Sequence, residues 1–199
     1  MLNRTHITLL VILSAAVWGI SLWALSVPLN FEHSKPFAIT VGVISFLSIA
    51  FDRWLWKWRI FRGWLVNRPV INGTWAATLK SDWEGSGTKN GKTIPGKMAI
   101  QQTFSKLTAR LYTKESSSFL VAHKIEEQND GVFQLFGTYQ NNPRIDLRGE
   151  KSEIHYGALM LEIRGNPSTS LVGHYWTDRG TRGSLSLTDR RDEIVTEFS

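Results

Sequence analysis

Two apolar segments without a charged residue occupy most of the first quarter of the chain. The first runs from Ile7 to Val27 and the second from Phe37 to Phe51. A helix of about 20 apolar residues spans a hydrocarbon core that is roughly 30 Å thick. At about 1.5 Å per residue the second segment covers only about 22 Å, so the Trp-rich residues after it must complete the span. These segments predict a membrane protein with an N-terminal two-helix transmembrane hairpin.

The charges beside the two segments predict an orientation. Glu32 and Lys35 lie between the segments, whereas five cations follow the second one: Arg53, Lys57, Arg59, Arg62 and Arg68. Cytoplasmic flanks carry the excess of Lys and Arg, so we expect both termini in the cytoplasm. The same cations suit the headgroups of anionic lipids. The net charge of the chain is +6, and we attribute part of it to cations that contact the lipid bilayer. We expect no DNA or RNA polymer as a partner.

The hydrophobic period changes after Val70. Apolar and polar residues then alternate, as in Leu185 and Leu187 against Ser184 and Ser186, and turn residues recur at short intervals. The predicted strands are about Ile71–Lys80, Gly96–Ser105, Leu107–Lys114, Ser118–Glu127, Gly131–Tyr139, Glu153–Ile163, Ser170–Thr177 and Arg182–Thr188. This pattern suits a closed meander barrel or a sandwich, and we expect an all-β, roughly eight-stranded antiparallel meander barrel. Residues 1–66 would hold the helices and a Trp/Arg-rich interfacial junction, and residues 67–199 a cytoplasmic β-barrel ligand-binding domain.

The composition of the strands bears on whether the barrel is hollow. Gly73-Thr74-Trp75 is similar to the opening of lipocalins, in which the tryptophan closes one end; a core tryptophan after a turn glycine explains it equally well. An eight-stranded barrel holds either one small ligand or its own side chains. Many expected inner and rim positions are polar: Gln102, Tyr112, Gln134, Tyr139, His155, Tyr156, His174, Tyr175, Thr177 and Thr181. Because buried polar groups need partners, these residues favour a polar ligand cavity.

Short catalytic and metal-binding motifs are missing from the sequence. There is no cysteine, no G-x-S-x-G elbow, no phosphate-binding P-loop and no paired-carboxylate signature. His123, His155 and His174 lie on separate predicted strands, without the close spacing of zinc ligands. We therefore expect a protein that is not an enzyme, with no cofactor and no metal site.

Two segments near strand ends form the candidate ligand site, residues 137–144 and 174–183. Aromatic rings stack on nucleobases, and arginine presents a planar fork to phosphate oxygens. The segments therefore predict a small phosphorylated nucleotide as the ligand, although solvated hairpin charges explain the arginines equally well. The candidate ligand-binding residues are Tyr139, Arg144, Tyr156, Tyr175, Arg179, Thr181 and Arg182.

Several short segments resemble a family of bacterial defence proteins. Asn72-Gly73-Thr74-Trp75 opens the β domain, and later strands carry His155-Tyr156-Gly157-Ala158-Leu159 and Gly173-His174-Tyr175-Trp176-Thr177. With the two helices and the basic Trp-rich junction, they resemble the two-transmembrane, β-strand-rich effectors of cyclic-oligonucleotide-based antiphage signalling (CBASS). The resemblance implies that the barrel binds a cyclic nucleotide second messenger and that binding drives self-association into oligomers. It also implies that the helices disrupt the bacterial inner membrane, in which they are multi-pass, and cause cell death.

Two other functions stay open on the sequence. The first is a membrane-tethered, lipocalin-like barrel that binds an apolar ligand. The second is a structural or adaptor protein whose barrel is filled by its own side chains. The polarity of a cavity would separate a nucleotide receptor from a lipocalin-like carrier, and a filled barrel would contain no cavity.

Overall fold

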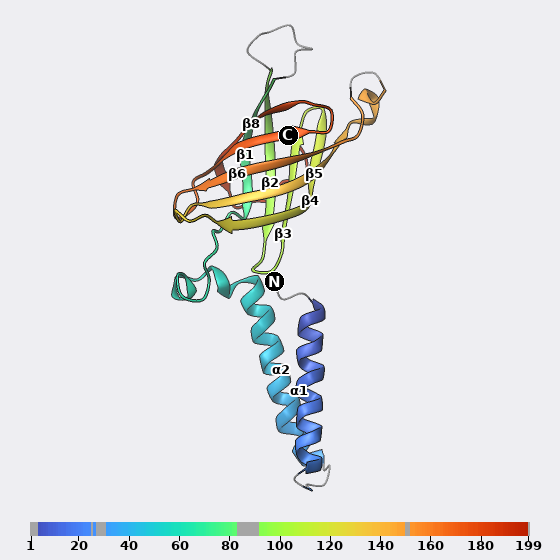
Figure 1. Ribbon diagram of the computed structural model, residues 1–199, viewed down its shortest axis with the longest axis vertical. Helices are drawn as coiled ribbons and strands as arrows, with labels where there is room; N and C mark the ends of the chain where they lie inside the picture. The colour runs from blue at the N-terminus through green and yellow to red at the C-terminus, as the bar shows by residue number, and fades with distance from the viewer. Residues whose placement is uncertain (1–3, 25, 27–30, 83–91, 150–151, 199) are drawn as a thin grey trace. The chain divides into compact units, whose positions relative to one another are not determined.

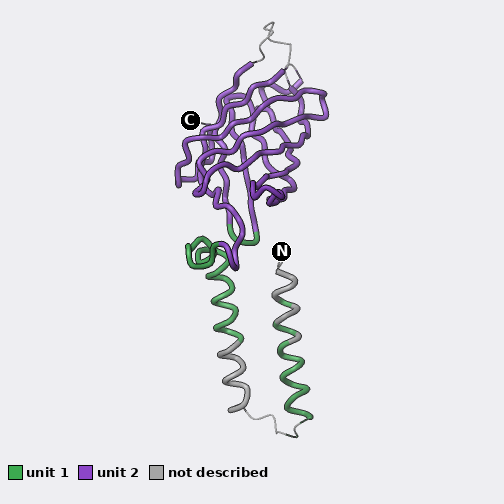
Figure 2. Tube along the Cα trace, turned by 60° about the vertical axis from the view of Figure 1, so that its left-hand side comes forward, with its two compact units in different colours: residues 1–62, 103–105 green, residues 63–102, 106–199 purple. Residues whose placement is uncertain are grey.

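The computed structural model describes residues 4–24, 26, 31–82, 92–149 and 152–198. The chain divides into two compact units (Figure 2). The helical unit comprises residues 1–62 with 103–105, and the barrel unit comprises residues 63–102 with 106–199.

The helical unit contains two long helices, α1 (Arg4–Ala24) and α2 (Phe31–Arg53). Within the described ranges, no helix combines the length and the apolarity needed to cross a bilayer. This finding contradicts the predicted transmembrane hairpin. The first predicted span required apolar residues up to Val27, whereas α1 ends at Ala24; α2 includes the charged residues of both its ends, so its uncharged part is the short second segment alone.

The residues after α2 form two single turns of 3₁₀ helix, η1 (Leu55–Lys57) and η2 (Arg59–Phe61), rather than a continuous helix. Within the helical unit Asp52 binds the segment 103–105: its carbonyl oxygen accepts from the Phe104 N–H at 2.9 Å, and its carboxylate from the Ser105 N–H at 2.8 Å. The Phe104 ring lies edge-on to Phe51, with ring centroids 5.2 Å apart. The Asp52 carboxylate therefore serves as a backbone acceptor here.

Eight strands form a closed antiparallel barrel in which each strand pairs with its neighbours in sequence and β8 returns to β1 (Figure 1). The strands are β1 (Gly73–Ser81), β2 (Lys92–Gln102), β3 (Leu107–Thr113), β4 (Ser116–Glu127), β5 (Phe133–Pro143), β6 (His155–Arg164), β7 (Ser170–Thr177) and β8 (Arg182–Arg191). A further 3₁₀ turn, η4 (Ile145–Leu147), follows β5. The predicted eight-stranded meander is confirmed. The predicted second strand, Gly96–Ser105, began four residues late and ended three residues late. It ends at Gln102 because the backbone at Phe104 and Ser105 bonds to Asp52 instead of a neighbouring strand.

One end of the barrel is filled by side chains. Trp75 is fully buried there, and its indole Nε1 donates to the Ile71 carbonyl at 2.9 Å. Gln102 is also buried: its amide accepts from the Ile71 N–H and donates to the Pro69 carbonyl, at 2.8 and 3.0 Å. Gln102 was predicted among the polar cavity residues, yet it secures the backbone that leads into β1. β1 begins at Gly73, whose φ of +132° disfavours any other residue. A Cβ added there would also lie 2.5 Å from the Arg191 carbonyl oxygen.

Candidate functional site

The other end of the barrel is hollow and holds a cavity of about 700 Å³. That volume lies within the roughly 300–1,000 Å³ typical of small-molecule sites. The inner part of the lining is aliphatic and includes Leu79, Met98, Leu111, Leu120, Leu159 and Leu185. The rest is rich in hydroxyl, amide and imidazole groups, among them Ser81, Thr113, Ser116, Ser118, Asn141, Ser152, His155, Thr177 and Thr181. The barrel is therefore not filled by its own side chains, which excludes that alternative.

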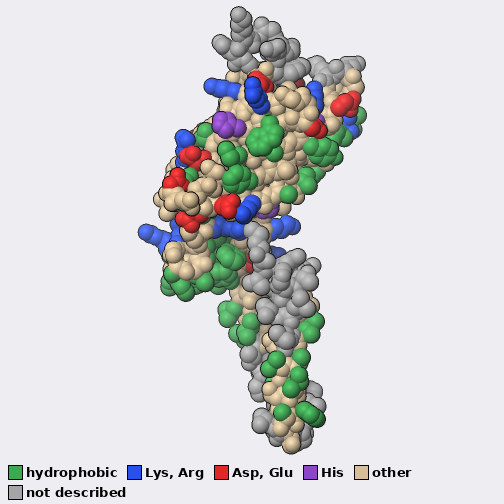
Figure 3. Space-filling model, viewed as in Figure 1, with side chains coloured by type: hydrophobic (Ala, Val, Ile, Leu, Met, Phe, Trp, Pro, Cys, Tyr) green, Lys and Arg blue, Asp and Glu red, His purple; other side chains and the backbone are tan. Residues whose placement is uncertain are grey.

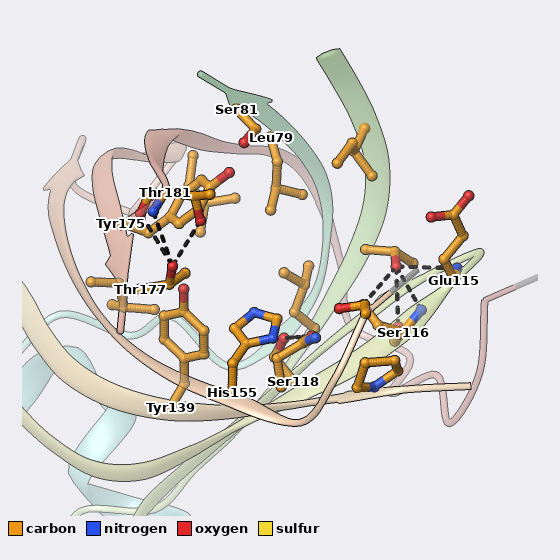
Figure 4. A pocket seen from close by; sticks show the side chains of 18 of the residues that line it. Leu79, Ser81, Glu115, Ser116, Ser118, Tyr139, His155, Tyr175, Thr177 and Thr181 are labelled. Carbon is orange, nitrogen blue, oxygen red and sulfur yellow. Dashed lines mark hydrogen bonds between the residues drawn. The ribbon is translucent and has the colours of Figure 1, made fainter. Parts of the chain in front are cut away.

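Tyr139 on β5 and Tyr175 on β7 project into this cavity, and each does so opposite a glycine (Figure 4). Tyr139 pairs with Gly157 across the β5–β6 ladder, and a Cβ added to Gly157 would lie 2.5 Å from the Tyr139 hydroxyl oxygen. Tyr175 pairs with Gly183 across the β7–β8 ladder, where an added Cβ would lie 2.7 Å from its hydroxyl oxygen. The glycines thus leave the space that the two rings occupy.

Burial governs the protonation of both tyrosines. Desolvation raises the pKa of Tyr139 well above its usual value, and the nearby Tyr175 and Asp178 raise it further. Desolvation also raises the pKa of Tyr175; a hydrogen bond with Ser81 opposes this rise, and the charge of Asp82 adds to it. Both phenols are therefore neutral at physiological pH. A neutral phenol donates a hydrogen bond to phosphate or carbonyl oxygens and presents a ring for stacking.

The polar part of the lining is organised by short side-chain hydrogen bonds. The Thr177 and Thr181 hydroxyls lie 2.7 Å apart across the β7–β8 turn, and the Ser118 hydroxyl donates to the Asn141 amide oxygen at 2.7 Å (Figure 4). Arg179 lies in the same turn as Thr181, and its guanidinium donates to the Ser152 hydroxyl at 2.9 Å. Because these groups are held in place, a ligand meets preorganised donors and acceptors.

Three cations contribute to the lining: Lys92, Lys114 and Arg179. Lys92 lies 3.9 Å from the Glu115 carboxylate, and both side chains are about half exposed. Such exposed pairs contribute little to stability, so the ammonium can turn to an anionic ligand at small cost. The cavity therefore combines aliphatic wall, aromatic rings, hydroxyls and positive charge, which are the groups that a phosphorylated nucleotide requires.

The structure brings four of the seven predicted site residues together. Tyr139, Tyr175, Arg179 and Thr181 all line the cavity. The other three are Arg144, which pairs with Asp146 at 3.0 Å; Tyr156, which is largely exposed; and Arg182, which pairs with Asp82 at 3.0 Å. These three do not line the cavity. The ligand-binding role of all seven residues stays a prediction.

Sequence reasoning did not single out several lining residues. Phe198, which follows the last strand, lines the cavity from a segment that is fastened to β1: the Thr74 hydroxyl donates to the Glu193 carbonyl and accepts from the Val195 N–H. Lys92 and Lys114 come from the ends of β2 and β3. The sequence could have indicated the two lysines only by their position next to a strand end. No periodic pattern marks Phe198.

Metal binding receives no support from the described part of the chain, where no cluster of three or more His, Asp or Glu side chains could hold an ion. His155 lines the cavity, but its Nδ1 lies 3.0 Å from the Glu153 carbonyl oxygen. The other histidines lie on β4, β7, α1 and α2. The expectation of a protein without metal or cofactor stays a prediction.

The fold and the cavity define the class of this protein: a β-barrel receptor for a small ligand. Comparison with known proteins specifies the family. Residues 66–189 match the model described as Cap15, cyclic dinucleotide receptor domain, and the chain belongs to this family. The match begins seven residues before β1 and ends at residue 189, within β8 and before the segment that carries Phe198.

Relatives with the name CD-NTase-associated protein 15 are similar to most of this chain. The protein from Staphylococcus schleiferi is 32% identical over 181 residues, 90% of this chain and 86% of the relative. The Yersinia aleksiciae protein is 27% identical over 149 residues, 74% and 67% of the two chains, and the Escherichia albertii protein is 23% identical over 150 residues, 73% and 72%. The predicted resemblance to effectors of CBASS antiphage signalling is confirmed, apart from its two transmembrane helices.

Proposed function

We propose that this protein detects a cyclic dinucleotide in the hollow end of its barrel and responds to it as an effector of antiphage defence. The observation that carries the proposal is the cavity of about 700 Å³, which lies within the barrel matched by the receptor family. Its aromatic rings suit the bases, and its cations suit the phosphates. The role is one of binding, and no step of it requires catalysis by this chain.

Ligand recognition divides between the two kinds of lining. Tyr139 and Tyr175 stack on or hydrogen-bond to the bases, since both rings are neutral and held opposite glycines. Arg179, with Lys92 and Lys114, neutralises the two phosphates. The aliphatic inner wall excludes water from the faces of the bases, which strengthens the polar contacts around them.

The output of binding is self-association of the protein, followed by disruption of the bacterial inner membrane from its cytoplasmic side and death of the infected cell. A ligand shifts an equilibrium only if it binds the assembled state more tightly than the single copy. Contact with the bilayer surface is supported by the residues after α2, where Trp54, Trp58 and Ile60 are each more than half exposed and alternate with cationic residues in the sequence. Figure 3 shows hydrophobic side chains on the surface of the helical unit. Tryptophan and cations together favour the headgroup region of anionic membranes.

Isothermal titration of the full chain with cyclic di-AMP, cyclic di-GMP and cyclic GMP-AMP tests the proposal. We expect saturable binding of at least one of them, with one ligand per barrel, and no binding of the matching linear dinucleotide, which lacks the closed ring. The aliphatic inner wall favours a lipocalin-like carrier as the second candidate. Binding of a fluorescent fatty acid, with no heat from any cyclic dinucleotide, would support that candidate and contradict the receptor.

A further inference from the structure

The ladder between β3 and β4 is much shorter than the two strands themselves. It joins Arg110–Tyr112 to Ser117–Phe119, whereas β4 pairs with β5 along its whole length, from Ser116 to Glu127. In Figure 1, β3 stands nearly upright and β4 crosses it, so that the two strands diverge beyond their shared residues. The second half of β4 is therefore an edge, although the barrel is closed by the pairing nearer its hollow end.

The backbone of this edge is available for pairing. Among the described residues, those from 122 to 127 have ladder partners on β5 alone, and Val121 lies at an irregularity of that ladder. Val121 is 60% exposed, and Lys124 and Glu126 form a pair at 2.9 Å on the outer face. Ile125 points the other way and packs against the core. An exposed strand edge of this kind is a template for strand addition.

We propose that the edge formed by residues 123–127 of β4 pairs antiparallel with the same edge of a second copy of this chain, in a two-fold register centred on Ile125. The proposal specifies the surface of the self-association proposed above and rests on it. A symmetric dimer presents the same residues from both copies, so the surface must be complementary to itself.

The charges on β4 favour a second copy of the chain as the partner, and they favour one pairing register over its neighbours. With Ile125 on the two-fold axis, Lys124 of each copy lies opposite Glu126 of the other, and both cross-strand pairs are attractive. Shifting the axis to Lys124 would place two lysines opposite each other, and shifting it to Glu126 would place two glutamates together. Registers one residue out of step would turn outer side chains to the inner face.

A second copy also fits better than an unrelated strand. An edge lysine is a common device against strand addition, because it repels or solvates the approaching strand. Here the negative charge of Glu126 offsets the positive charge of Lys124, because the two residues lie at equal distances on either side of Ile125, where the two-fold axis passes. At the far end of the edge, Asn67 donates to the Glu127 carboxylate through its side chain, which leaves the strand backbone from 121 to 126 unobstructed by that contact.

Charge reversal on the full chain provides the test, with sedimentation velocity in the absence and presence of cyclic di-AMP, cyclic di-GMP and cyclic GMP-AMP. Lys124→Glu and Glu126→Lys each replace two attractive cross-strand pairs by two repulsive ones, and each should lower the dimer association constant by about tenfold or more. The two single variants should associate with each other when mixed, because each then meets the opposite charge. The double variant, Lys124→Glu with Glu126→Lys, should recover self-association.

Matched controls come from β6, where Glu162 and Arg164 form a similar pair at 2.7 Å but the strand is paired on both sides. Glu162→Lys and Arg164→Glu should leave association unchanged. Association of the wild type that survives both β4 variants, or single variants that fail to associate when mixed, would overturn this surface. A wild type that stays monomeric with every nucleotide would overturn the surface and the self-association together, while the titration above would still decide whether the barrel binds its ligand.

Discussion

Tyr175 occupies the space that a side chain at Gly183, its partner across the β7–β8 ladder, would fill. A Cβ at position 183 would lie 2.7 Å from the Tyr175 hydroxyl oxygen and 2.1 Å from the Lys80 carbonyl oxygen on β1. The backbone approach is closer than the approach of the ring, so this glycine sets both the spacing of three strands and the position of a cavity residue.

Gly183→Ala should therefore destabilise the barrel. Overpacking of this kind costs about 1–3 kcal/mol, because neither the Lys80 backbone nor the ring can yield freely. Chemical denaturation measures the loss. Gly42→Ala is the control, since a Cβ there meets nothing within 4 Å and alanine favours the helix. Equal stability of the two variants would show that the β1–β8 spacing adjusts without cost.

Substitution of Arg179 and of Arg182 should affect ligand affinity differently. Arg179 lines the cavity, whereas Arg182 is exposed and paired with Asp82. Arg179→Ala should weaken binding of the cyclic dinucleotide by about 1.5–3 kcal/mol, the usual range for a hydrogen bond to a charged group. Arg182→Ala should leave the affinity unchanged in the same titration. The opposite result would place the phosphates outside the cavity and support the sequence-based expectation for Arg182.

Phe198 should contribute to ligand affinity from outside the family match. Its ring lines the cavity, and a base–aromatic contact is worth about 1–3 kcal/mol. Phe198→Ala should weaken binding within that range, and Phe198→Tyr should retain most of it because the ring is kept. Calorimetric titration of both variants checks the expectation, which fails if removal of the ring leaves the affinity intact.

The two buried tyrosines predict a loss of stability at alkaline pH. Both have a folded-state pKa above the unfolded value, so their stabilising effect is complete below about pH 10, the usual pKa of tyrosine, and is lost as the pH rises through the folded pKa. In that window each tyrosine lowers the free energy of unfolding by at most about 1.4 kcal/mol per pH unit. Tyr139→Phe should flatten the dependence measured by denaturation at about pH 9 and about pH 11. An unchanged slope would show that the Tyr139 phenol is accessible to hydroxide in the folded protein.

Gln102 should matter for stability and not for the ligand. Its amide satisfies the Ile71 N–H and the Pro69 carbonyl at the filled end of the barrel. Gln102→Leu leaves these groups without their partner and should cost about 1–3 kcal/mol in the free energy of unfolding. Ligand affinity, measured at a temperature where the variant is folded, should not change. A selective loss of affinity would mean that the ligand reaches this end.

The sequence by itself predicted the barrel and the chemical character of its ligand. Period-two alternation and closely spaced turn residues depend on local preferences, and these are readable along the chain. Tyr139, Tyr175, Arg179 and Thr181 were found because the sequence places them near the ends of predicted strands, although β5 continues four residues past Tyr139. The same reasoning took long apolar runs as spans, and failed where the helix boundaries did not follow the runs.

Only the tertiary structure decided which polar residues face the cavity and where the barrel has an edge. Gln102 alternates as a cavity residue would, yet it lies at the filled end, because the position along the strand depends on how the barrel is staggered. Phe198 lines the cavity at the end of a segment that Glu193 and Val195 hold to Thr74 by hydrogen bonds, more than a hundred residues away in the chain. The exposed edge of β4 follows from the divergence of two adjacent strands. Such features arise from contacts between residues far apart in sequence, and local patterns carry no record of them.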